Sequence, residues 1–394
     1  MAKNAGPAPA GAGDMLFERC AALKRTESRL SAVYAARGYR EVATSAFEYY
    51  DTFLLAGNPL TQDRMWVVTA GDGRLHVLRP DSTTPIARIA ARRLCEEPLP
   101  LRLCYNQYVF RREQGGRAAV IPQSGIELLG AVGVRADAEA VMTAIAALDS
   151  LGLEGFKLEL GHVGLFKRLT ALVPFSEEDL EYIRQDIQNK NCAALNETLA
   201  PYRAEAPGPC AAIAALPKLF GGADVFREAR ALIDDRAALS ILDELETLLA
   251  RLESVCPATV IVDLGLVQHI NYYSGLVFKG YLAGTGEAAL SGGRYDGLLA
   301  HFGRPLSAVG FALSLDAVLA ALERAHRLEP APPCDALLYF EERDMKNCYE
   351  TLAALERAGL RCEVSFADSL DEARQAARKE GVARVVTAEG EVAP

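Results

Sequence analysis

Apolar residues in the first 160 positions follow a helical repeat in some segments and a strand repeat in others. A repeat of about 3.6 residues predicts an amphipathic helix near the start, built on Leu16, Cys20, Leu23, Leu30, Val33 and Tyr34. Helical spacing predicts further helices at 84–95 and 136–151. Apolar alternation predicts strands at 42–47, 75–78, 101–109, 125–133 and 156–160. Because strands outnumber helices and arrive as neighbours, we expect an α+β fold with an antiparallel sheet and packed helices.

The pattern becomes helical without strands from about 165 to 255, which predicts an inserted helical subdomain. Strand patterns resume over 259–290, and 308–322 predicts a closing strand and helix. We therefore expect a main domain over 15–325, preceded by a disordered Ala-, Gly- and Pro-rich tail at 1–14.

The last 60 residues predict a small α/β domain. A Pro-rich hinge, Pro330 to Pro333, comes before it. The domain, expected over 335–394, has a β-α-β-α-β pattern at 336–340, 346–358, 362–365, 370–379 and 384–387.

Composition narrows the class of protein. The chain has 394 residues, half of them apolar, with a formal charge of −10, which does not favour binding to nucleic acid. Its nine cysteines never form C-x-x-C, and no secretory or membrane-spanning run is present, so we expect reduced thiols in the cytoplasm. Phosphate-binding glycine motifs and metal-ligand spacings are also absent from the sequence, and we expect neither a cofactor nor a metal.

Three groups of residues are candidates for binding or catalysis, and a structural role is the alternative explanation for each. Arg111, with Glu113 two residues on, can bind a zwitterion or a nucleotide, or can form a structural salt bridge. Gly292-Gly293 before Tyr295 suits a close approach to a ligand or a strand, and equally a tight turn. Tyr272 and Tyr273 point in alternate directions, so at most one of them faces a given pocket. For His162 and His269, a structural role is more common than a role as ligand or base.

Taken in order, these segments resemble histidyl-tRNA synthetase, a class II aminoacyl-tRNA synthetase. Residues 38–48 look like its motif 1 region, 78–83 are similar to its R-P-E-G-T loop, and 110–113 with Gln123 and Glu127 resemble motif 2. Residues 271–275 and 292–296 resemble its histidine-pocket motifs. The resemblance implies a class II synthetase-like fold and a histidine-binding set: Asp81 and Thr83 at the ammonium, Arg111 at the carboxylate, Gln123 and Glu127 orienting the ligand, and Tyr272 and Tyr273.

The sequence departs from the synthetase where the enzyme contacts phosphates. Gln268 and Ala317 occupy the positions of two arginines that the resemblance places at the α- and γ-phosphates of ATP. Removing one preorganised charge of this kind typically raises a barrier by about 3–4 kcal/mol. The C-terminal domain is also shorter than the anticodon-binding domain of the enzyme. We therefore expect no catalytic residues.

This combination is similar to the ATP phosphoribosyltransferase regulatory subunits, which are histidyl-synthetase paralogues of histidine biosynthesis. That family implies a hetero-oligomer with a short-form catalytic subunit, a glycosyltransferase, and feedback control with histidine as effector. A class II core also implies a homodimer through motif 1. A divergent histidyl-tRNA synthetase and an RNA-binding or translation-factor paralogue are the competing hypotheses.

Overall fold

The computed structural model describes residues 11–55, 62–69, 71–112, 118–256, 259–267, 273–328 and 334–394. The chain divides into two compact units, Met1–Leu328 and Glu329–Pro394, and each is described by itself. The proposed tail at 1–14 lies largely outside the described residues, as does the Pro-rich hinge.

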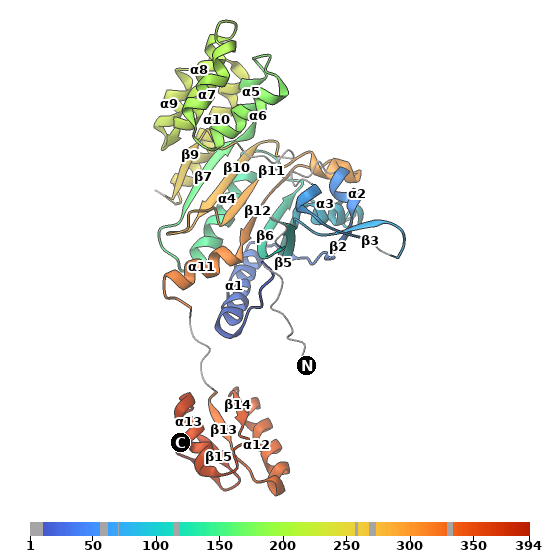
Figure 1. Ribbon diagram of the computed structural model, residues 1–394, viewed down its shortest axis with the longest axis vertical. Helices are drawn as coiled ribbons and strands as arrows, with labels where there is room; N and C mark the ends of the chain where they lie inside the picture. The colour runs from blue at the N-terminus through green and yellow to red at the C-terminus, as the bar shows by residue number, and fades with distance from the viewer. Residues whose placement is uncertain are drawn as a thin grey trace, which may run out of the picture. The chain divides into compact units, whose positions relative to one another are not determined.

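A large antiparallel-rich sheet forms the centre of the first unit (Figure 1). Its described strands lie in the order β1-β5-β6-β12-β11-β10-β7-β9-β8, and all neighbours are antiparallel except β1 with β5 and β7 with β9. Their bounds are β1 Arg40–Glu41, β5 Leu101–Arg112, β6 Ala118–Leu129, β7 Lys157–His162, β8 Phe220–Gly221, β9 Val260–Asp263, β10 Leu276–Tyr281, β11 Leu290–Arg294 and β12 Ala308–Ser314. The predicted antiparallel sheet is confirmed.

Helices α1 (Phe17–Ala36), α4 (Gly133–Ser150) and α11 (Leu315–Arg324) pack against this sheet and bury its apolar side. In β6, Ile126 and Leu128 are fully buried in that core. Because side chains alternate along a strand, Gln123 and Glu127 lie on the opposite side of the sheet. The polar residues of β6 therefore lie on the side of the sheet that α1, α4 and α11 do not cover, where they are available for a binding site.

The predicted helical insertion is confirmed, with the two-residue strand β8 as an exception. Helix α10 buries Leu242, Leu245 and Leu249 at helical spacing and contacts β7 and β9, so the insertion lies beside that end of the sheet (Figure 1). The helices are α5 Val163–Thr170, α6 Glu177–Gln188, α7 Cys192–Leu199, α8 Pro207–Ala215, α9 Asp224–Arg230 and α10. Helix α10 itself spans Arg236–Glu253. In the described part of the chain, every helix is too short or too polar to cross a membrane.

A smaller three-stranded sheet, β2-β4-β3, corrects the prediction of one strand at 42–47. The chain leaves the large sheet after β1 and enters the small one at β2 (Phe47–Tyr49), which pairs with β4 (Leu75–Leu78) and through it with β3 (Trp66–Thr69). The backbone between them bonds elsewhere: Val42 N–H donates to Cys104 O at 2.8 Å, and Ala46 O accepts from Arg79 N–H at 2.9 Å. The alternating pattern is thus shared between two sheets.

Other predicted elements of the first unit are present with shifted ends. The strand expected at 125–133 is β6, which ends at Leu129, since Gly133 already begins α4. The helix expected at 84–95 is α3 (Thr83–Arg92), and a short helix, α2 (Tyr50–Leu55), follows β2. Strand β4 has the predicted bounds.

The second unit is a four-stranded sheet, β14-β13-β15-β16, with one helix on each face. Helix α13 (Leu370–Glu380) covers one side through Ala373 and Ala377, and α12 (Met345–Arg357) covers the other through Cys348. The predicted β-α-β-α-β order is confirmed, and β16 was not predicted. The strands are β13 Ala336–Leu338, β14 Cys362–Val364, β15 Val385–Thr387 and β16 Gly390–Val392.

The packing of α1 predicts a strong effect of Leu30→Ala and a weak effect of Leu16→Ala. Leu30 is fully buried, whereas Leu16 is 61% exposed. Truncating a buried leucine typically costs about 2–5 kcal/mol of unfolding free energy. Urea unfolding followed by the fluorescence of Trp66, the single tryptophan, measures both variants. Equal losses would contradict this packing.

Candidate functional site

A cavity of about 320 Å³ opens on the side of the large sheet opposite α1 and α4. Its wall is built from the loop before α3, from β5, β6, β11 and β12, and from Tyr273 and Tyr295. Six of the seven predicted site residues line it: Asp81, Thr83, Arg111, Gln123, Glu127 and Tyr273. Tyr272 lies outside the described residues, together with Gln268, His269 and Glu113.

Glu127 lies at the base of the cavity and is 1% exposed. One carboxyl oxygen accepts a hydrogen bond from the hydroxyl of Thr83 at 2.7 Å, and the other accepts from the hydroxyl of Tyr295. Burial raises the pKa of Glu127 to about 8, although both hydrogen bonds oppose that rise. The group is therefore held mostly protonated near neutral pH.

The sequence predicts Tyr295 only as part of the histidine-pocket motif 292–296, and not as a separate site residue. Its contact with Glu127 joins positions 168 residues apart. The neighbouring Arg294 is turned away into an ion pair with Asp137 at 2.6 Å and Asp296 at 3.1 Å. Within this motif, Tyr295 therefore lines the cavity, and Arg294 stabilises the fold through its ion pairs.

Gly310 faces Glu127 across the pairing of β12 with β6. A Cβ atom at 310 would overlap the carboxyl oxygen that accepts from Tyr295. Only glycine leaves the space for the Glu127 side chain at this point.

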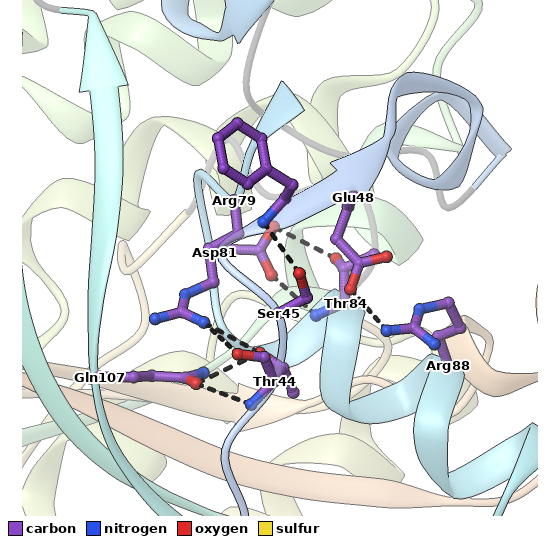
Figure 2. Close-up of polar contacts among 9 residues, drawn as sticks. Thr44, Ser45, Glu48, Arg79, Asp81, Thr84, Arg88 and Gln107 are labelled. Carbon is purple, nitrogen blue, oxygen red and sulfur yellow. Dashed lines mark hydrogen bonds and ion pairs between the residues drawn. The ribbon is translucent and has the colours of Figure 1, made fainter. Parts of the chain in front are cut away.

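Asp81 is fixed by the first turn of α3 before any ligand arrives. Its carboxylate accepts hydrogen bonds from the backbone N–H of Thr84 at 2.7 Å and from the Thr84 hydroxyl at 3.2 Å (Figure 2). An acidic group near the start of a helix is also stabilised by the helix dipole. This carboxylate is thus oriented by the fold.

Arg79 holds the loop that contains Asp81 in place through hydrogen bonds to two neighbouring segments. Its guanidinium donates to the carbonyl oxygens of Thr44 at 2.6 Å and Tyr108 at 2.7 Å, and Figure 2 shows it directed at Thr44 and Gln107. Burial lowers the pKa of Arg79. The loop therefore connects β5 with the segment that leads into the small sheet.

The described wall of the cavity holds one group of each charge near neutral pH. Asp81 and the mostly protonated Glu127 face it, and among the described lining residues Arg111 is the single cation. The Arg111 Nε donates to Pro80 O at 2.9 Å, which places the guanidinium beside the loop. Such a lining suits a small molecule with an ammonium and a carboxylate group.

Two other predictions concern residues outside the cavity. Ala317 lies in the first turn of α11, partly buried against the main core, where its N–H is capped by the Ser314 hydroxyl. His162 accepts a hydrogen bond from Gly164 N–H at 3.1 Å, and burial lowers its pKa to about 4. His162 therefore has the structural role expected of it.

Comparison with known proteins places the chain among two related groups. A family model described as histidyl-tRNA synthetase matches residues 11–318. An ATP phosphoribosyltransferase regulatory subunit from Clostridium botulinum is 35% identical, covering 97% of this chain and 92% of the relative. One from Bacillus cereus is 32% identical, with the same two coverages.

Solved structures agree with these relatives. The structure titled ATP phosphoribosyltransferase regulatory subunit/histidyl-tRNA synthetase from Bacillus halodurans has a TM-score of 0.85 and 30% identity, covering 96% of this chain and 97% of that one. Histidyl-tRNA synthetase from Nostoc has a TM-score of 0.77 and 22% identity, covering 96% and 90%. The second supports the fold alone, and both agree with the class II synthetase-like architecture.

The raised pKa of Glu127 predicts a pH-dependent stability. An unfolded chain ionises this carboxyl near 4.5 and the folded chain near 8, so the folded state keeps a proton between these values. Raising the pH across that interval should destabilise the wild type relative to Glu127→Gln, on the order of 4–5 kcal/mol at about 1.4 kcal/mol per tenfold proton affinity. Urea unfolding of both proteins at several pH values tests this, and parallel profiles would contradict it.

Proposed function

This chain belongs to the family of ATP phosphoribosyltransferase regulatory subunits, and we propose that it is the non-catalytic subunit of that enzyme in the first step of histidine biosynthesis. It is needed for the activity of a short-form catalytic subunit, which joins ATP to phosphoribosyl pyrophosphate, and for inhibition by histidine. The observation that carries the proposal is a cavity with amino-acid-binding groups and one cation in its described lining.

The proposed ligand fits the cavity group by group. Asp81 and Thr83 receive the ammonium of histidine, and Arg111 pairs with its carboxylate. Gln123 and Glu127, both buried, orient the imidazole from β6, and Tyr273 closes the far wall. Histidine thereby pairs its own charges with groups of opposite sign.

The same lining disfavours adenylation. The triphosphate of ATP is highly anionic, and a synthetase stabilises it with several positive groups. Here Gln268 and Ala317 are neutral at two of those positions, and the carboxylate of Asp81 adds a negative charge to the cavity. Histidine binding without its activation is what supports a regulatory role.

Regulation then follows from differential binding. If histidine binds more tightly to one of two states of the assembly, it shifts the equilibrium toward that state by the difference in binding free energy. A coupling of about 1–3 kcal/mol changes the affinity about 5- to 150-fold. The regulatory chain therefore controls its partner without taking part in the chemistry, in the cytoplasm where the pathway operates.

A homodimer within the hetero-oligomer is supported by one exposed face of the small sheet. Phe47, Tyr49 and Val68 are 52%, 42% and 38% exposed. Phe47 and Tyr49 lie two residues apart in β2, and Tyr49 and Val68 both pair with His76 of β4, so the three share one face. An apolar face of this kind is typical of a protein–protein interface.

The first test measures ATP phosphoribosyltransferase activity of the short catalytic subunit with and without this chain. We expect activity to appear with the chain and to fall when histidine is added. Glu127→Ala should keep the activation and lose at least tenfold in histidine sensitivity, because the ligand loses a buried partner. Unchanged inhibition would show that histidine acts elsewhere. Histidine-dependent ATP–pyrophosphate exchange by the chain would instead support a synthetase.

The second test concerns the exposed face. Val68→Lys should weaken the homodimer in sedimentation experiments, since a buried lysine without a partner is costly at an interface. Val255→Lys is the matched control, because Val255 is 62% exposed just beyond the end of α10. Equal dimerisation of both variants would exclude this face.

A further inference from the structure

Two hydroxyl groups on the wall of the cavity have no hydrogen-bond partner among the described residues. They belong to Tyr105, which is fully buried, and Ser82, which is 2% exposed. Both side chains line the cavity. The Ser82 hydroxyl lies close enough to Tyr105 to lower the pKa of the phenol, but the two hydroxyls do not meet in hydrogen-bond geometry.

Comparable hydroxyls nearby are satisfied. Thr83 and Tyr295 donate to Glu127, and the fully buried Tyr34 accepts from the Ser124 hydroxyl at 3.2 Å. Leaving a buried hydroxyl without a partner costs free energy, so such groups are uncommon away from binding sites. The unpaired hydroxyls of Ser82 and Tyr105 therefore need an explanation of their own.

The fold makes room for the Tyr105 hydroxyl at the expense of a side chain. Tyr105 pairs with Gly125 between β5 and β6, and a Cβ atom on Gly125 would lie 2.6 Å from the hydroxyl oxygen. The loop provides the second hydroxyl at the position where the R-P-E-G-T pattern has glycine, beside an acid one methylene shorter.

The surroundings of the two hydroxyls indicate which ligand group they receive. Burial raises the pKa of Tyr105 well above its ordinary value, and Glu127 and Asp81 add to that rise, so the phenol is neutral. All three residues line the same cavity. Ser82 lies between Asp81 and Thr83 in the chain. An ammonium group has three N–H donors, and the carboxylate of Asp81 with the hydroxyl oxygens around it, that of Thr83 included, supplies suitable acceptors.

We infer that Ser82 and Tyr105 are histidine-contacting residues whose hydroxyls, with the carboxylate of Asp81, receive the ammonium of the bound amino acid. The assignment rests on the proposed function and deepens it. It makes the cavity selective for an α-amino acid over the same imidazole compound without the amino group. It also explains why a short acid is sufficient at 81.

The experiment is calorimetric titration of the full chain with L-histidine and with 3-(imidazol-4-yl)propionate, which lacks the ammonium. Tyr105→Phe and Ser82→Ala should each weaken histidine binding about tenfold or more and leave the affinity for the propionate unchanged. In the ligand-free protein, Tyr105→Phe should unfold at the same or a higher urea concentration, because it removes an unpaired buried hydroxyl.

Tyr34→Phe is the matched control, since it removes a buried hydroxyl that already has a partner. It should lower the stability and keep the histidine affinity. Unchanged histidine binding in Tyr105→Phe and Ser82→Ala, or an equal loss for the propionate, would overturn the assignment while the proposed function stands. If the unaltered chain binds no histidine, the proposed function and this assignment both fail.

Discussion

The arrangement of the cavity depends on one buried carboxyl group. Glu127 lies on the polar side of β6 and takes hydrogen bonds from Thr83 at the start of α3 and from Tyr295 after β11. A carboxyl removed from water is tolerated only when it is neutral or well bonded, and here both conditions are met. The loop before α3, helix α3 and strands β11 and β12 are therefore held close to the carboxyl group of Glu127.

The sequence predicted the fold class, the helical insertion and most strands, because these depend on local apolar periods. Six of the seven residues that it predicted for the histidine site line one cavity, since the motifs that contain them keep their order. It did not single out Tyr295, whose contact with Glu127 joins distant segments. It also did not single out Ser82 and Tyr105, because burial of their hydroxyls depends on the folded structure. The strand expected at 42–47 was wrong because an alternating pattern does not reveal which sheet a residue joins.

Under the proposed function, the same cavity illustrates how a site changes from catalysis to sensing with few substitutions. Recognition of an amino acid needs groups matched to one ammonium, one carboxylate and one ring. Stabilising a transferring phosphoryl group needs additional positive charge in a low-dielectric site. Because these two sets of groups are separate, the neutral residues Gln268 and Ala317 remove charge that would stabilise the phosphoryl group. They leave the groups that recognise the amino acid in place.

The close approach of Gly310 to Glu127 has a consequence for how the chain can evolve. A Cβ atom at 310 would also lie 2.3 Å from the carbonyl oxygen of Ile126, so a smaller residue 127 does not by itself make room for a side chain at 310. The glycine is therefore required by the backbone of β6 as well as by the acid. A lineage that keeps this strand pairing must keep glycine at 310, even after the acid is lost.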